Sequence, residues 1–357
     1  MTHAAVVHDL RPAERSGPRA SDTLIRGRRV LPYPDGWFAV CFSHELKRGD
    51  VRTVPFMGQE LVVYRTHAGE AFAVEPFCPH LGAHLGHGGK VDGDDLVCPF
   101  HGLAFAPDGS CVRACGGQKP PHATLTRRFT QERNGMVVVW NHRTGQAPEW
   151  EIPDVDTQGF SKPKGSSFDL EGYPHDVAEN ATDLSHFAWL HGFTDVAMHH
   201  EAGPQWMTTH LSGRWHGIEI KIRLTSHGLG YVLGESDVAS LGVKVTTCAF
   251  PTPTAPLKWT FRWTDALRVA RMDALPAVLR RPLYALIIKL AHKWFVHVVA
   301  ADFPIWSNRR YVEHPKLMAG DAAVAAFRRW SAQFYPGAPV SDTDLPDIDG
   351  GGVWTRG

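Results

Sequence analysis

The sequence predicts an α+β protein built from two domains, a small all-β domain followed by a larger α+β domain. Short strand-like runs separated by turn dipeptides fill the first part of the chain, and long apolar helical segments occur only later. A segment rich in Pro, Gly and polar residues separates the two patterns. With 357 residues, of which 43% are hydrophobic, the chain is long enough for two cores. We expect a flexible N-terminal arm over 1–31, the all-β domain over 32–141, a linker over 142–165, the α+β domain over 166–337 and a C-terminal tail over 338–357.

The all-β domain is predicted from five runs rich in aromatic and β-branched residues. Three dipeptides typical of tight hairpin turns accompany them, namely Asp92-Gly93, Asp108-Gly109 and Asn134-Gly135. The pattern indicates a small domain of short strands. The runs are Trp37–Phe42, Leu61–Arg65, Ala71–Glu75, Asp95–Val97 and Met136–Trp140.

The second domain is predicted from a mixture of strands and helices, which indicates an α+β layer with room for a pocket. Helical patterns cover Val177–His191, Leu283–Ala300 and Asp321–Phe334. The strand-like runs are Leu211–Arg223, Gly230–Leu233, Val243–Phe250 and Leu257–Trp263.

The segment Leu283–Ala300 is the most apolar part of the chain, and four residues interrupt it: Lys289, His292, Lys293 and His297. Its apolar residues recur at helical spacing, so we expect a buried amphipathic helix rather than a membrane span. The strongest apolar positions are Leu283, Leu286, Ile287, Leu290, Ala291, Trp294 and Val298.

Charge and cysteine content exclude several classes of protein. Lys and Arg number 37, as do Asp and Glu, so the net charge gives no basic footprint for nucleic acid or anionic lipid. The N-terminal segment lacks the apolar core of a signal peptide. Six cysteines in a chain of this length do not form a disulfide framework, and we expect a cytoplasmic protein.

Two cysteines and two histidines form the strongest signal. Cys78-Pro79-His80 is followed, after seventeen residues, by Cys98-Pro99-Phe100-His101. Two thiolates and two imidazoles can hold a structural zinc ion, or a Rieske [2Fe–2S] cluster in which two His replace two Cys on one iron. Zinc-finger spacings usually pair like ligands, whereas here each loop carries one Cys and one His. The spacing therefore favours the cluster, with zinc as the alternative.

A second candidate metal site lies in the segment 177–191. His186 and His191 are five residues apart, about 140° around a regular helix, so both can reach one metal only if the helix ends or bends near His191. Two His and one carboxylate with open positions form the facial triad of O₂-activating iron enzymes. The candidate carboxylate is Asp302, just after the apolar helix. Competing histidines, each more typical of a surface or a core, are His175, His199, His200, His210 and His216.

Together the two motifs resemble the Rieske non-haem iron oxygenase family over nearly the whole chain. Within that family the sequence is most similar to the steroid and sterol branch. This branch includes the oxygenase of 3-ketosteroid 9α-hydroxylase and the Neverland-type cholesterol 7-desaturase. The resemblance implies a Rieske domain followed by a helix-grip (START/Bet v 1-like) catalytic domain, in a head-to-tail homotrimer. The matching stretches are Tyr33–Phe38, Cys78–Ala83, Cys98–Gly102, Asp302–Trp306, Phe327–Trp330 and Gln333–Tyr335.

The resemblance also implies a role for each matching residue. Asp183 would be the carboxylate that links a cluster His of one subunit to an iron-ligating His of its neighbour, and Asn180 would lie near the iron without binding it. The implied ligands are Cys78 and Cys98 on one cluster iron, His80 and His101 on the other, and His186, His191 and Asp302 on a mononuclear Fe(II).

The function implied is that of the oxygenase component of a Rieske monooxygenase. Such a component takes electrons from NAD(P)H through a separate flavin/iron–sulfur reductase or a ferredoxin. It uses O₂ to hydroxylate or desaturate a lipophilic, steroid- or sterol-like substrate. Two alternatives stay open: the same chemistry on a non-steroid aromatic or natural-product substrate, and an electron carrier fused to a lipid-binding module.

Overall fold

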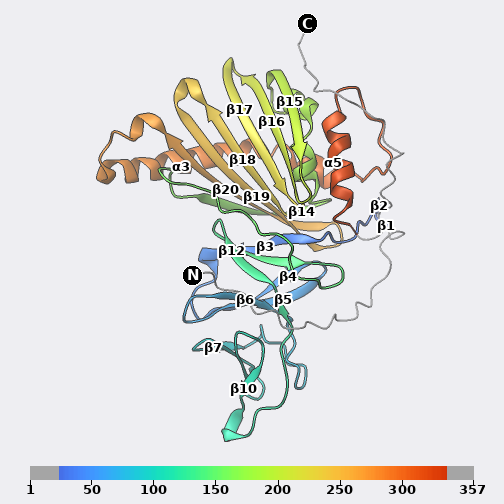
Figure 1. Ribbon diagram of the computed structural model, residues 1–357, viewed down its shortest axis with the longest axis vertical. Coiled ribbons are helices and arrows are strands. Elements are labelled where there is room, and N and C mark those ends of the chain that lie inside the picture. Colours follow the sequence, from blue (N-terminus) through green and yellow to red (C-terminus); the bar gives the residue numbers. More distant parts are fainter. Residues whose placement is uncertain (1–23, 336–357) are drawn as a thin grey trace.

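The computed structural model describes residues 24–335 and places one large sheet with its helices above three small sheets (Figure 1). The described part of the predicted N-terminal arm forms a hairpin of β1 (Leu24–Ile25) and β2 (Arg28–Arg29). Arg28 ties this hairpin to the C-terminal domain by donating a hydrogen bond to Ser307 O (2.7 Å). The predicted tail 338–357 lies outside the described residues.

Three small antiparallel sheets make up the N-terminal domain, and all five predicted strands are present. The first has the order β12-β13-β3 (Thr130–Arg133, Met136–Asn141, Gly36–Phe42). The second is β11-β6-β5-β4 (Arg127–Arg128, Ala71–Val74, Gln59–Arg65, Val51–Phe56). The third is β10-β9-β8-β7 (Cys111–Arg113, Ala104–Phe105, Asp95–Val97, Lys90–Asp92).

The predicted hairpin turns connect these strands. Arg133 pairs with Met136 across Asn134-Gly135, and both turn residues have positive φ (50° and 78°), as a type I′ turn requires. Asp92 pairs with Asp95 across a turn that begins at Gly93. The third predicted dipeptide, Asp108-Gly109, lies in a longer loop, because Phe105 pairs with Cys111.

Strand β3 joins the two domains, and all seven of its residues are buried. Phe38 packs into the core of the N-terminal domain, whereas Trp37 belongs to a second core that includes Tyr231 of the large sheet. Arg262 of the large sheet donates a hydrogen bond to Ala39 O (2.9 Å). The N-terminal domain is therefore fixed against one face of the large sheet.

The large sheet is antiparallel and has the order β14-β20-β19-β18-β17-β16-β15. The single strand predicted over Leu211–Arg223 is wrong, because a turn at His216-Gly217 with positive φ (48° and 80°) divides it into β16 and β17. Strand β14 begins inside the predicted linker, and β15 was not predicted. The strands are β14 (Lys164–Glu171), β15 (Thr194–Ala202), β16 (Trp206–Trp215), β17 (Ile218–His227), β18 (Tyr231–Val238), β19 (Val243–Ala255) and β20 (Lys258–Val269).

Five α-helices accompany this sheet in the described residues, and the α+β class is confirmed. The predicted helix over Val177–His191 is instead two short helices, because the chain leaves helical geometry at Asp183. The helices are α1 (Asp176–Asn180), α2 (Leu184–Trp189), α3 (Ala277–Val299), α4 (Phe303–Asn308) and α5 (Ala322–Ala332).

Helix α3 crosses the large sheet, and the predicted apolar face is only partly buried, since Ile287 and Ala291 pack against a core but most of the other predicted positions do not. The residues that α3 buries are Tyr284, Ile288, His292 and Val299. By length and composition, Ala277–Asn308 is apolar enough to cross a membrane, and only 22% of its most apolar window is buried. The predicted apolar positions that stand exposed are Leu283, Leu286, Leu290 and Trp294.

Candidate metal centres

The two Cys- and His-bearing loops repeat one backbone structure. Gly82 N donates a hydrogen bond to Cys78 O (2.9 Å), and Gly102 N donates one to Cys98 O (3.1 Å). Both glycines have positive φ (74° and 64°), a conformation that other residues adopt with strain. The repeated turn gives the two loops equivalent local geometry.

The four donors form a pair of thiols and a pair of imidazoles. Cys78 and Cys98 are each only 3% exposed, and burial, together with the adjacent Cys98 thiol, raises the pKa of Cys78. The rings of His80 and His101 lie 5.0 Å apart between centroids, nearer the surface. A cluster with two thiolates on one iron and two imidazoles on the other needs this pairing of like with like. A lone zinc ion would need all four donors equally around one point. The residues therefore fit a Rieske cluster.

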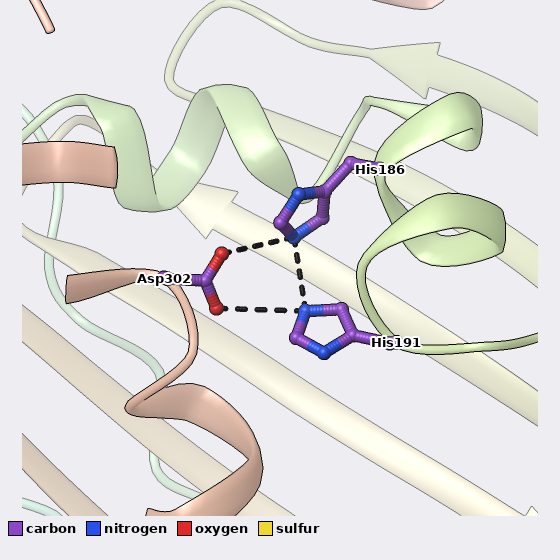
Figure 2. Close-up of side chains that lie close together, drawn as sticks. All are labelled: His186, His191 and Asp302. Carbon is purple, nitrogen blue, oxygen red and sulfur yellow. Dashed lines mark hydrogen bonds and ion pairs between the residues drawn. The ribbon is translucent and has the colours of Figure 1, made fainter. Parts of the chain in front are cut away.

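His186, His191 and Asp302 converge on a common point (Figure 2). His191 Nε2 lies 3.0 Å from His186 Nε2, Asp302 Oδ1 lies 3.2 Å from His186 Nε2, and Asp302 Oδ2 lies 3.5 Å from His191 Nε2. Ligands about 2.1 Å from a metal are about 3.0 Å apart at a right angle and about 3.4 Å apart at a tetrahedral angle. Burial lowers the pKa of His186, which favours the neutral, metal-binding imidazole. The three side chains therefore fit one metal ion.

The break between α1 and α2 brings the two histidines together. Asp183 has extended geometry (φ −97°, ψ 100°), and its Oδ1 accepts a hydrogen bond from His186 N (2.9 Å), which caps α2. Helix α2 ends at Trp189, so His191 lies beyond the last helical residue. The condition that the helix end near His191 is therefore met.

Asp302 is positioned by α3, which ends three residues before it. His292, only 4% exposed, ties α3 to the sheet: its Nδ1 lies 2.7 Å from Asp265 Oδ2 and its Nε2 lies 2.8 Å from Ser166 Oγ. Asn180 Nδ2 donates a hydrogen bond to Asp302 Oδ1 (3.1 Å). Asn180 thus contacts the carboxylate and orients it.

A buried ion network holds Asn180 in place. The preceding residue, Glu179, accepts hydrogen bonds from Arg309 (2.7 Å) and Arg328 (2.8 Å). Burial alone would raise the pKa of Glu179, but Arg328 and the other cations around it lower this pKa to about 2. Sequence reasoning missed the network because the three residues are far apart in the chain. The stretch Phe327–Trp330, which carries part of the resemblance, was the one available signal.

The competing histidines do not join the triad. His175 lies at the start of α1, where burial lowers its pKa to about 4. His199 and His210 stack on neighbouring strands with ring centroids 4.6 Å apart. They border a hollow of about 470 Å³ over β15–β18 whose lining mixes apolar and charged residues and contains no triad residue. His200 lies on β15, and His216 lies in the turn between β16 and β17.

Comparison with known proteins assigns a known domain to each of the two metal centres. Residues 36–126 match the Rieske [2Fe-2S] domain, and residues 139–335 match the 3-ketosteroid 9alpha-hydroxylase C-terminal domain. The chain is 31% identical to cholesterol 7-desaturase nvd of Xenopus laevis, over 90% of this chain and 77% of that protein. The chain belongs to the Rieske oxygenase family. This Rieske oxygenase is an oxidoreductase whose two sites are suited to a [2Fe–2S] cluster and a non-haem iron.

Other relatives agree with this assignment. The oxygenase component of 3-ketosteroid-9-alpha-monooxygenase from Rhodococcus rhodochrous is 24% identical, over 94% of this chain and 90% of that protein. The NdmA QL mutant of Pseudomonas putida CBB5 with caffeine has a TM-score of 0.65 at 17% identity, over 89% of this chain and 96% of that chain. Dicamba monooxygenase bound to dicamba has a TM-score of 0.59 at 16% identity, over 84% and 97%. The predicted family and fold are confirmed.

One buried carboxyl group beside the Glu179 network destabilises the folded protein when it is ionised. Asp176 is 0% exposed, and within residues 24–335 neither of its carboxylate oxygens accepts a hydrogen bond, although Arg309 Nη1 lies 3.5 Å from Oδ1. Burial raises the pKa of Asp176 to about 8, so the folded protein binds a proton here that the unfolded chain releases near its ordinary pKa. This group therefore lowers stability as the pH rises from about 4 to about 8.

Asp176→Asn should remove that pH-dependent cost. The melting temperature of the variant should exceed that of the wild type by several degrees near pH 8, and the difference should shrink near pH 5. Thermal melts followed by fluorescence at both pH values measure this. A difference of equal size at both pH values would contradict the protonated state assigned to Asp176.

Proposed function

We propose that this Rieske oxygenase uses O₂ and electrons from a separate reductase to hydroxylate or desaturate a lipophilic substrate of the steroid or sterol class. The convergence of His186, His191 and Asp302 within 3.5 Å of one another, beside an apolar strip, carries the proposal. The relatives named cholesterol 7-desaturase and 3-ketosteroid-9-alpha-monooxygenase support the substrate class.

The apolar strip leads away from the triad along β17. Ile218, Ile220 and Ile222 alternate with charged residues, so they share one face of the strand over about 13 Å, and each is partly exposed. Ile222 belongs to the same apolar cluster as Phe187, whose ring centroid lies 5.6 Å from that of His186. An elongated apolar molecule bound along this strip would have one end at the triad and would exclude water from it.

Residues of the chain prepare the site for this chemistry. When bound, the cluster supplies electrons and the mononuclear iron supplies the centre at which O₂ is activated. Asn180 orients Asp302 through the hydrogen bond to Oδ1, and Phe187 shields the His186 ring. Asp183 uses Oδ1 to cap α2, and within residues 24–335 its Oδ2 has no hydrogen-bond partner. That oxygen is available to a histidine of a neighbouring subunit.

We propose a head-to-tail homotrimer. Within one chain, the sheet that contains β7 and β10 lies at the far end of the molecule from β15 and α3 (Figure 1). Large apolar side chains stand exposed at both ends: Leu81 (65%) and Phe100 (60%) on the cluster loops, and Trp189 (87%) on α2 beside the triad. Contact between these surfaces would bring the cluster of one copy to the triad of the next.

The electron source proposed is NAD(P)H, through a flavin/iron–sulfur reductase or a ferredoxin. We place the protein in the cytoplasm, since all six cysteines are free and thiols stay reduced there.

The substrate class is tested by turnover. Purified protein with a reductase and NADH should consume NADH and O₂ in a fixed ratio to product when sterols or ketosteroids are supplied. Small aryl compounds and methylxanthines should leave consumption at its background rate. Product formation from aryl compounds alone would overturn the steroid or sterol assignment and would leave the oxygenase chemistry intact.

Asp183→Asn tests the proposed electron path. The amide keeps the oxygen that caps α2 but loses the charge, so folding and both metals should be retained while turnover falls about 10- to 100-fold. Single-turnover oxidation of the reduced cluster, followed by its visible spectrum, measures the step directly. Undiminished turnover coupled to product formation would refute the bridging role.

Complementation between two inactive variants tests transfer between copies. Asp302→Ala should lose the mononuclear iron and keep the two cluster irons, whereas Cys98→Ser should lose the cluster. Coexpressed in equal amounts, the two should recover about a quarter of wild-type activity, because one contact in four joins an intact cluster to an intact triad. Transfer within a single chain predicts no recovery. Iron analysis of each variant alone is the control.

A further inference from the structure

Helix α3 has two apolar faces, and the sheet covers one of them. The outer stripe contains Leu279, Leu286 and Leu290, which are 58%, 55% and 61% exposed. In a helix of 3.6 residues per turn, Leu286 lies about 200° from Ile288, which is buried against the sheet. Leu283 and Trp294 flank the same stripe and are 40% and 43% exposed. An exposed patch of this kind marks an interaction surface.

The charged residues of α3 all carry positive charge. The helix contains Arg280, Arg281, Lys289 and Lys293 and no Asp or Glu, in a chain whose formal net charge is zero. Lys289 lies three residues after Leu286, and Lys293 lies three residues after Leu290, so both lysines border the apolar stripe. The zero net charge of the whole sequence therefore conceals a local concentration of positive charge, and it does not exclude an anionic lipid surface.

We propose that α3 docks this protein on the surface of a lipid bilayer that contains anionic lipids. A stripe of Leu and Trp bordered by Lys is the pattern of a helix that lies in the plane of the membrane interface. The complementary partner must offer an apolar interior beneath a negative surface, and an anionic bilayer has both. The proposed contact between copies uses the cluster loops and α2, which leaves the outer face of α3 uncovered.

Helix α3 lies on the bilayer rather than across it. His292 is buried between α3 and the sheet, next to Asp265 and Ser166, and a spanning helix would have to break these contacts. Pro282 also interrupts the backbone hydrogen bonds near the start of the helix. Docking on one face keeps the sheet and the triad on the aqueous side.

The location of α3 connects the bilayer to the active site. Asp302 follows the end of α3 by three residues, so docking places the triad close to lipid in which apolar molecules dissolve. The suggestion that the bilayer brings apolar molecules to the triad rests on the proposed function. Docking of α3 on the bilayer does not rest on it, and the test of docking requires no turnover.

Vesicle cosedimentation of the full-length protein with both metals tests the proposal. Wild-type protein should bind vesicles of phosphatidylcholine mixed with phosphatidylserine, bind pure phosphatidylcholine less, and dissociate in high salt. The pair Leu286→Gln with Leu290→Gln, and the pair Lys289→Glu with Lys293→Glu, should each lower the partition coefficient about tenfold or more. All four residues are exposed, so the substitutions should leave the core intact. An unchanged visible spectrum and an unchanged melting temperature would show that folding is retained.

Matched controls separate a specific surface from general attraction. Lys47→Glu with Lys119→Glu makes the same charge change on exposed lysines of the other domain, and Val112→Gln with Met318→Gln replaces apolar residues that are 46% and 61% exposed. Both controls should bind vesicles like the wild type. Absence of wild-type binding, or equal losses in the controls, overturns the proposal. Dissociation of the oligomer by the leucine pair, in size-exclusion chromatography with light scattering, would assign the face to a contact between copies and would also overturn it.

Discussion

The site depends on holding one carboxylate within 3.5 Å of two imidazoles that come from a distant part of the chain. Each ligand has its own restraint. The cap at Asp183 sets where α2 begins, and the end of α2 releases His191 toward His186. Asp302 is fixed from two sides, by α3 through His292 and by Asn180. These restraints are needed because a metal ion is held firmly only when neighbouring residues fix the orientation of its ligands.

The same constraint explains why so much buried charge surrounds the triad. Asn180 can hold Asp302 only if α1 is rigid, and Glu179 provides that rigidity by pairing with Arg309 and Arg328. A buried carboxylate with two guanidinium partners is stable only as a complete set, since loss of one partner leaves a charge uncompensated. Asp176 has an ion pair with Arg309 at 3.5 Å, and burial raises its pKa because this pair does not compensate for the loss of water. Charge in this region is therefore organised around the geometry of one ligand.

Sequence reasoning succeeded where local residues determine structure. The loops at Cys78 and Cys98 and the turn at Asn134-Gly135 depend on neighbours in the chain, and each was predicted. The two histidines were proposed from their pairing, and Asp302 from its position just after the apolar helix. The helix over Val177–His191 was predicted without its break, because an aspartate that caps a helix looks the same in sequence as one inside it. His292, Asp265 and Ser166 come together only in the folded sheet, so no sequence pattern pointed to them.

The error on α3 has a physical cause that also explains its outer face. Periodicity locates apolar stripes but does not say which stripe packs, and α3 has two. The sheet packs against the stripe that contains Tyr284, Ile288 and His292, because the sheet offers a buried polar partner to His292. The stripe with stronger apolar character, centred on Leu286 and Leu290, was left outside. Exposure of that stripe to water is unfavourable, so its persistence beside Lys289 and Lys293 implies a second environment that is apolar within and negative at its edge.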